Sequence, residues 1–317
     1  MLQQDTTTNS SEITQAVDPA VDLLNQPSVG LSSLSVTDGI IDDRVGITAE
    51  PQPEWFIAYV WRTVGELRYV KFALASFIIN SLRRRYQRSI LGFAWSLLNP
   101  LLMMIVLTAV FSLIFKRDAK AYGIFIFTGL LPWTFISESI ATGCSSITAA
   151  ENFMKKVYIP KIFFPLVSVA TELINFALSL VSMMALALLV GLHLHWAVLL
   201  LPVAMAVTFL FTFGIALALA VATVYFRDIT HFVRVILTCF FYLIPIVYPL
   251  SAVPEKYVIF FQINPFSHFI NLYRDIIYSG TAPTVNEWLI TVALSGVSLF
   301  VGFAILRQKE KDIIFRL

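Results

Sequence analysis

The chain has 317 residues, of which 58% are hydrophobic and only 13% are charged, and its formal net charge is +2. Soluble domains carry about 25% charged residues, so this composition excludes an ordinary water-soluble globule. It predicts an all-α integral membrane protein. The two cysteines, Cys144 and Cys239, both lie in apolar runs, which excludes a disulfide framework and a thiolate metal cage, and we expect no metal site.

The first 54 residues differ from the rest of the chain in charge and composition. Residues 1–54 hold nine acidic residues and one basic residue, a net charge of −8, whereas the remainder carries +10. The segment contains no aromatic residue and few aliphatic ones, so it cannot bury enough apolar surface to fold. We predict a disordered acidic tail over 1–54 and a transmembrane domain over 55–317.

Residues 55–82 place apolar side chains at helical spacing, with charged residues between them. The most apolar stretch, 72–82, is 11 residues long, and a helix needs about 20 residues to cross a bilayer. We therefore predict an N-terminal amphipathic helix that lies in the membrane interface and contacts membrane lipids.

Four arginines follow this helix closely: Arg83, Arg84, Arg85 and Arg88. One interpretation is a positive-inside signal that fixes the orientation of the next span. The other is a guanidinium cluster that binds the phosphate or pyrophosphate headgroup of a substrate, because planar bidentate donors suit that group. The sequence leaves both interpretations open.

Six apolar segments are long enough, or nearly so, to cross a bilayer as helices. The predicted spans are 93–115, 122–147, 162–192, 196–226, 232–250 and 288–306. With the N-terminus in the cytoplasm, the cytoplasmic segments carry sixteen lysines and arginines, and the outer segments carry five. The positive-inside rule thus predicts that both termini are cytoplasmic.

The loop 149–162 between the second and third spans carries an apolar stripe of its own. Phe153, Met154, Val157 and Tyr158 recur at i, i+4 spacing beside Lys155 and Lys156, and Pro160 ends the pattern. We predict a short amphipathic helix that either lies on the membrane or docks into a groove of a partner. The turn at Arg227 and Asp228 is a second candidate contact or a local ion pair.

Residues 251–287 separate the last two predicted spans. Two apolar stretches, 257–263 and 266–278, are too short to cross and are divided by Asn264 and Pro265, which favour a sharp turn. We predict two short re-entrant helices, with a plain outer loop as the alternative.

Two acidic residues, Glu138 and Glu172, fall inside predicted spans. Intramembrane carboxylates are candidate functional groups by default, although hydrogen bonding between helices is an equal alternative here. The chain contains no Gly-Lys dipeptide and hence no P-loop, so it cannot bind nucleotide in that manner. We expect no enzymatic activity and no cofactor in this chain.

Residues 85–100, RYQRSILGFAWSLLNP, resemble the segment that enters the first span of ABC-type polysaccharide-export permeases. The resemblance continues through 155–160, 225–229, 248–250 and the Asn264–Pro265 pair, and covers about 55–310. The acidic tail lies outside the family pattern. These permeases export O-antigen, capsular polysaccharide and teichoic acid.

The resemblance implies a homodimer in the bacterial inner membrane, with a channel at the subunit interface and no nucleic-acid partner. It further implies two ABC ATPase subunits, which hold Mg-ATP, and an undecaprenyl-pyrophosphate-linked polysaccharide as cargo, with O-antigen as the first candidate. By this resemblance the arginines bind the headgroup, and Asn264 and Pro265 belong to the outer gate. The residues that it assigns to ATPase coupling are Phe153, Met154, Lys155, Lys156, Val157, Tyr158, Arg227 and Asp228.

Three alternatives remain at this point. An ion- or proton-coupled carrier or channel would use Glu138 and Glu172 as its relay, but the sequence shows no inverted repeat. A membrane-embedded enzyme acting on a lipid-linked sugar would need paired carboxylates or a metal cluster at an interface, which the short loops lack. A drug-exporting permease would share the same fold.

Overall fold

The computed structural model describes residues 55–87, 94–116, 118–189 and 195–316, and every regular element in these ranges is a helix. The predicted acidic tail and Arg88 lie outside the described residues. The all-α fold class is confirmed for the part of the chain that is described.

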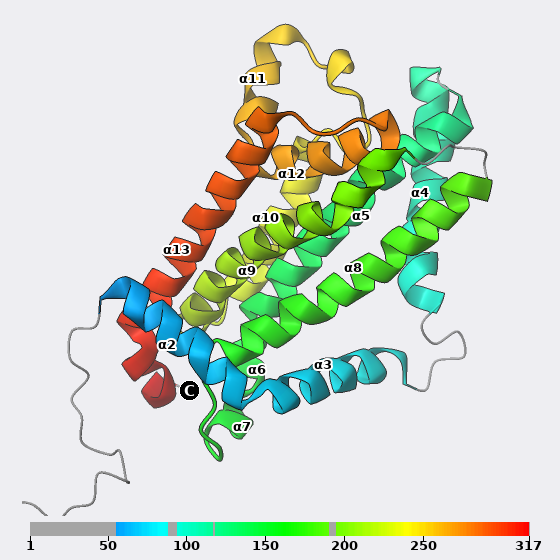
Figure 1. The fold of residues 1–317 in the computed structure, drawn as a ribbon. Helices are drawn as coiled ribbons and strands as arrows, with labels where there is room; N and C mark the ends of the chain where they lie inside the picture. The colour runs from blue at the N-terminus through cyan, green and yellow to red at the C-terminus, as the bar shows by residue number, and fades with distance from the viewer. Residues whose placement is uncertain (1–54, 88–93, 117, 190–194, 317) are drawn as a thin grey trace, which may run out of the picture. The chain divides into compact units, whose positions relative to one another are not determined.

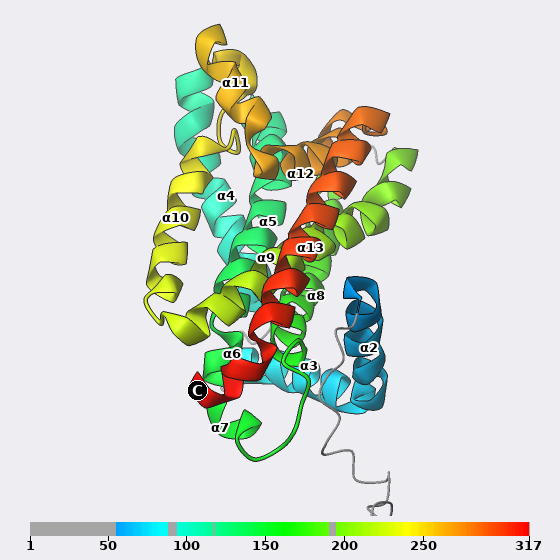
Figure 2. The ribbon, with the colours of Figure 1, turned by 90° about the vertical axis from the view of Figure 1, so that its left-hand side faces the viewer.

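Five helices are long and apolar enough to cross a membrane, and they match five of the six predicted spans. They run side by side in Figures 1 and 2 and make the chain a multi-pass membrane protein. The five are α4 (Ala94–Phe115), α5 (Ala119–Cys144), α8 (Phe163–Leu189), α9 (Leu201–Tyr225) with the preceding turn η1 (Trp196–Leu200), and α13 (Val285–Arg316).

The remaining predicted span contains a shorter helix, α10 (Ile229–Leu243). Its 15 residues extend about 22 Å, less than the roughly 30 Å of a hydrocarbon core. The prediction of a helix that continues through Pro245 is wrong, because a residue before proline avoids the helical conformation, and Ile244 is extended. Buried residues continue the chain, and Arg274 donates a hydrogen bond to the carbonyl of Ile246 at 2.9 Å.

Helices α9 and α13 approach each other closely over small residues. The Oγ of Ser298 donates to the carbonyl of Phe211 at 2.7 Å, and that of Ser295 donates to Val207 at 2.9 Å. A Cβ atom at Gly302 would lie 2.5 Å from the carbonyl oxygen of Gly214. Small residues permit this close approach in membrane bundles. Close packing matters there because the hydrophobic effect does not drive helices together within lipid.

We expect Gly302→Ala to destabilise the protein by about 1–3 kcal/mol, because the added methyl group forces α9 and α13 apart. Gly296→Ala on the same helix is the matched control, since its Cβ would meet no atom within 4 Å. Thermal unfolding in detergent should show a lower midpoint for Gly302→Ala alone. Equal midpoints for the two variants would contradict this account of the packing.

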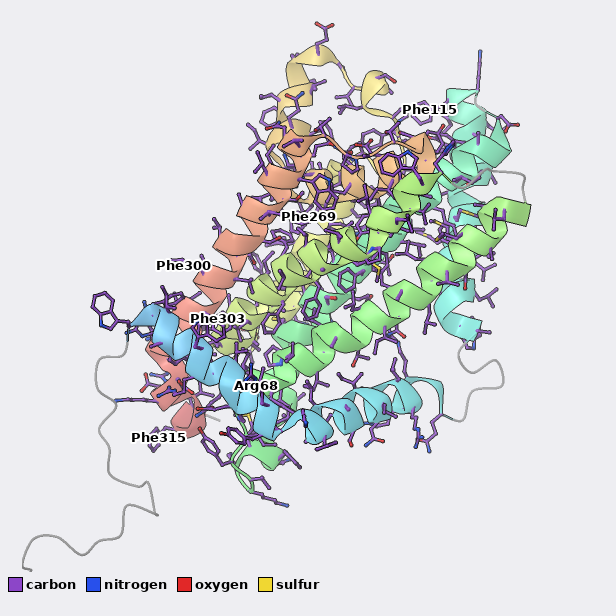
Figure 3. All side chains as sticks on the ribbon, viewed as in Figure 1. Arg68, Phe115, Phe269, Phe300, Phe303 and Phe315 are labelled. Carbon is purple, nitrogen blue, oxygen red and sulfur yellow. The ribbon has the colours of Figure 1, made fainter. Side chains whose placement is uncertain are left out.

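The predicted N-terminal amphipathic helix is divided into two helices, α2 (Phe56–Tyr69) and α3 (Lys71–Tyr86), which break at Val70. Both pack on the bundle: the ring of Phe56 lies 4.9 Å from that of Phe300 on α13, and Phe77 contacts Phe163 on α8 at 5.3 Å (Figure 3 labels Phe300). The apolar face thus rests partly on protein. The interfacial position stays a prediction.

Helices α11 (Glu255–Ile263) and α12 (Pro265–Tyr273) occupy the two stretches predicted as re-entrant, and the π-helical turn η3 (Arg274–Ser279) follows. The Asn264 side chain accepts a hydrogen bond from the amide of Phe266 at 3.0 Å, and Pro265 opens α12, so the pair forms a helix start. Phe269 of α12 is buried, whereas α11 buries no residue. Their re-entry into the membrane stays a prediction.

Candidate functional site

One end of the bundle gathers many of the basic residues singled out in the sequence. Helices α2 and α3, the short helices α6 (Ser146–Ala149) and α7 (Glu151–Met154), and the C-terminal end of α13 lie there in both views (Figures 1 and 2). Arg83, Arg84 and Arg85 form the last turn of α3. We call this the basic end, defined by the residues Arg83, Arg84, Arg85, Lys155, Lys156 and Arg227.

A cavity of about 1310 Å³ opens at the basic end. Arg83 and Arg84 of α3 line it, and so do Ala149 of α6 and Phe153 of α7. Ser145 and Ser168 add hydroxyl groups. The structure therefore brings two of the candidate headgroup residues and one candidate coupling residue to a single cavity.

Arg85 faces a different environment. Its Nη1 atom donates to both carboxylate oxygens of Glu172, at 2.6 and 2.8 Å, and Asn175 donates to the same carboxylate at 3.2 Å. Glu172 is only 8% exposed. Of the two interpretations of this intramembrane acid, the contacts match the one in which it is partnered. The 87 positions between Arg85 and Glu172 hide this pair from sequence analysis.

The apolar stripe of loop 149–162 is divided between two directions. Helix α7 is a single turn, and its Met154 is buried while the ring of Phe153 contacts Phe77 at 5.4 Å. Val157 and Tyr158 are 49% and 72% exposed. The stripe is divided because the chain leaves the helix at Lys155, so i, i+4 spacing no longer places side chains on one face.

Glu151 joins the two candidate coupling segments, and sequence reasoning missed it. One carboxylate oxygen lies 2.7 Å from Nζ of Lys155, and the other lies 3.3 Å from Nη2 of Arg227. The hydrogen bond from Lys155, helped by both positive charges, lowers the pKa of Glu151 below its ordinary value of 4.5. Since the folded pKa is depressed, this link is present at neutral pH and is lost as the pH falls below 4.5 through that lower value.

We expect Glu151→Gln to loosen the loop after α7 without unfolding the bundle, because it removes both ion pairs. Trypsin should then cut after Lys155 or Lys156 faster than in the wild-type protein at neutral pH. Asp228→Asn is the control, since it removes a neighbouring acid that does not join the two segments. Equal cleavage rates in Glu151→Gln and the wild type would show that Glu151 does not hold the loop.

A second acidic residue, Glu310 near the end of α13, ties three segments together. The hydroxyl of Tyr59 on α2 donates to it at 2.9 Å, and Nζ of Lys161 lies 3.8 Å away. Burial of Tyr59, together with the negative charge of Glu310, raises the pKa of that phenol above its ordinary value. The segment after α7 is thereby fixed to both α2 and α13.

In the ranges that the structure describes, no group of three or more His, Cys, Asp or Glu side chains is placed to hold a metal ion. Glu138 lines a second, smaller cavity together with Arg85 and Glu172. Asn264 and Pro265 lie away from the basic end, at the junction of α11 and α12 (Figure 1). Their role as an outer gate stays a prediction.

Comparison with known proteins identifies the family of this chain. Residues 73–278 match the family of ABC-2 type transporters. The O-antigen export system permease protein RfbA of Myxococcus xanthus is 32% identical over 253 residues, which cover 79% of this chain and 97% of that protein. The protein of the same name from Klebsiella pneumoniae is 30% identical over 229 residues, covering 72% of this chain and 88% of the relative.

A more distant relative is the polysialic acid transport protein KpsM of Escherichia coli, which is 20% identical over 247 residues, or 77% of this chain and 96% of that protein. The family match over residues 73–278 includes the arginine cluster and the loop after α5, which both carry the resemblance in the sequence. The chain belongs to the ABC-2 type transporter family and, within it, to the polysaccharide-export permeases.

Proposed function

We propose that this chain is the transmembrane subunit of an ATP-driven exporter that moves a lipid-pyrophosphate-linked polysaccharide out of the cytoplasm. The observation that carries the proposal is the cavity of about 1310 Å³ that both Arg83–Arg84 and Phe153 line. A ligand bound there contacts the arginines and the loop after α7 together. Binding of a headgroup and movement of that loop are then physically linked.

In this proposal the basic end faces the cytoplasm, as the bias of Lys and Arg requires. Helix α10 with the buried segment 244–247 forms the sixth crossing, which puts both termini on the cytoplasmic side of the inner membrane. Trp55 and Trp61 are exposed on or beside α2, where aromatic rings suit the headgroup region.

In this proposal Arg83 and Arg84 bind the pyrophosphate headgroup of the substrate. Both side chains are exposed at the cavity, and guanidinium groups bind the oxygens of a pyrophosphate through paired hydrogen bonds. Arg85 does not bind the headgroup in this proposal, because its guanidinium group already pairs with Glu172. That ion pair holds the end of α3 against α8. O-antigen is the first candidate for the glycan, since two relatives are named for its export.

The energy comes from two separate ABC ATPase subunits, because this chain has no P-loop to hold Mg-ATP. Val157 and Tyr158 offer the exposed apolar contact to the ATPase, and Lys156 and Asp228 are exposed charged residues that can add to it. A homodimer of the chain would place one such contact opposite each ATPase and form the channel at its interface.

Depletion of the protein from the cells that make it tests this function. We expect surface polysaccharide to disappear while the lipid-linked glycan accumulates on the cytoplasmic side of the membrane. Restoring the wild-type chain should reverse both changes. Normal surface polysaccharide after depletion would overturn the proposal.

A further inference from the structure

A second cavity, of about 270 Å³, lies among α4, α5 and α8 beside the last turn of α3. Its volume lies just below the roughly 300–1,000 Å³ range of small-molecule sites, so it suits a ligand of about one ring. Arg85 lines it, whereas the preceding residue, Arg84, lines the larger cavity. The two cavities therefore adjoin the same turn of α3.

The polar wall of this cavity holds two carboxylates, one fixed by hydrogen bonds within the protein and one available to a ligand. Arg85 and Asn175 hold the carboxylate of Glu172 in a fixed position by hydrogen bonds. Glu138, on the facing helix α5, is exposed, and the residues that the structure describes give its carboxylate no hydrogen bond and no ion pair. A carboxylate within a span needs a partner, and a bound ligand supplies one.

The apolar wall is aromatic. The rings of Phe135 and Phe176 stack with centroids 5.0 Å apart and an interplanar angle of 7°, and Trp95 of α4 is 47% exposed at the same cavity. Phe135 and Phe176 are buried, so Trp95 offers the exposed aromatic face, and an aromatic face beside a few fixed polar groups is the usual composition of a site for a partly apolar ligand.

The chemistry of this lining selects among the ligand classes. Arg85 already neutralises Glu172, so the charge of Glu138 remains and repels a phosphate, and a lipid chain would leave Glu138 without a hydrogen-bond partner. A sugar ring fits both walls, because its hydroxyl groups donate to carboxylates while its C–H face stacks on an aromatic ring. Thr134 and Asn99 add further hydrogen-bonding groups to the lining.

We propose that this smaller cavity binds the sugar residue nearest the pyrophosphate, with Glu138 accepting hydrogen bonds from its hydroxyl groups and Trp95 stacking on its ring. The proposal rests on the proposed export of a lipid-linked glycan and deepens it. A headgroup held by Arg83 and Arg84 leaves its attached sugar beside Arg85, at the entrance to the second cavity. The cavity then distinguishes a glycan-bearing lipid from the bare lipid pyrophosphate.

Binding of two probes to the purified permease with its ATPase tests this directly. The probes are farnesyl pyrophosphate and the same lipid carrying one glucose residue on the pyrophosphate. We expect the wild-type protein to prefer the glucose-bearing probe. Glu138→Gln should weaken binding of the glucose-bearing probe about tenfold, the value of one charge-assisted hydrogen bond. Trp95→Leu should also weaken it, because the stacking contact is lost. Neither variant should change the binding of farnesyl pyrophosphate.

Two variants outside both cavities are matched controls: Glu255→Gln on α11 and Trp61→Leu on α2. Both should keep the wild-type preference, and all variants should unfold at the wild-type temperature. The inference is overturned if Glu138→Gln weakens the two probes equally, or if neither cavity variant changes the preference. Wild-type protein that binds neither probe would count against the proposed headgroup site itself and would remove this inference with it.

Discussion

We expect replacement of Arg83 and Arg84 together by alanine to abolish export and to lower the affinity for a lipid pyrophosphate by about 100-fold. Each charge-assisted hydrogen bond contributes about 1.5–3 kcal/mol. Losing two of them costs at least about 3 kcal/mol, and 1.4 kcal/mol corresponds to a factor of ten. Lysine at both positions should restore binding only in part, because an ammonium group keeps the charge and loses the planar fork. Surface polysaccharide and binding of farnesyl pyrophosphate are the two readouts.

Arg68→Ala is the control for this experiment. Arg68 is an exposed basic residue of α2 that lies outside the large cavity (Figure 3). Its removal changes the net charge without touching the arginine pair, so export should persist. Full export by the double alanine variant, present in the membrane at the wild-type amount, would contradict the headgroup role.

We expect Tyr158→Ala combined with Val157→Asp to separate the permease from the proposed ATPase. Truncating an exposed aromatic residue at the centre of an interface costs about 2 kcal/mol or more, and a buried unpaired aspartate adds to that cost. Purification in mild detergent should yield one ATPase per wild-type permease and only background ATPase with the double variant.

Tyr257→Ala provides the control, because Tyr257 is also an exposed tyrosine but lies on α11, away from the basic end. It should retain the ATPase. Phe153→Ala acts by a different route: it removes the ring contact with Phe77 and should lower the thermal unfolding midpoint as well. If the Tyr158→Ala, Val157→Asp variant kept its full share of ATPase, the loop after α7 would not be the contact.

The spans were predictable because a bilayer demands long apolar runs, and five such runs became helices of sufficient length. The prediction for the remaining apolar run, 232–250, gave too long a helix. The run is mostly apolar, but Pro245 ends the helix at Leu243. The break between α2 and α3 at Val70 was not predictable, because no Gly or Pro lies at that position. Local composition therefore gave the number of apolar segments but not every helix boundary.

The candidate site was predictable as a set of residues and not as an arrangement. The arginine cluster stood out by composition, but its division between two cavities depends on Glu172, which only the packing of α3 on α8 brings to Arg85. Glu151 had a local signal, the i, i+4 spacing to Lys155, whereas its contact with Arg227 spans 76 positions. Glu310 and Tyr59 meet only through the tertiary fold.

Reconstitution into proteoliposomes tests the central claim most directly. The permease and its ATPase, with a lipid-pyrophosphate-linked oligosaccharide in the outer leaflet, should deliver the glycan to the lumen only when Mg-ATP is supplied outside. Omitting the ATPase, or replacing Arg83 and Arg84 by alanine, should stop delivery. Delivery by the permease alone, driven by a proton gradient and lost on Glu138→Gln, would contradict the account and identify a proton-coupled carrier instead.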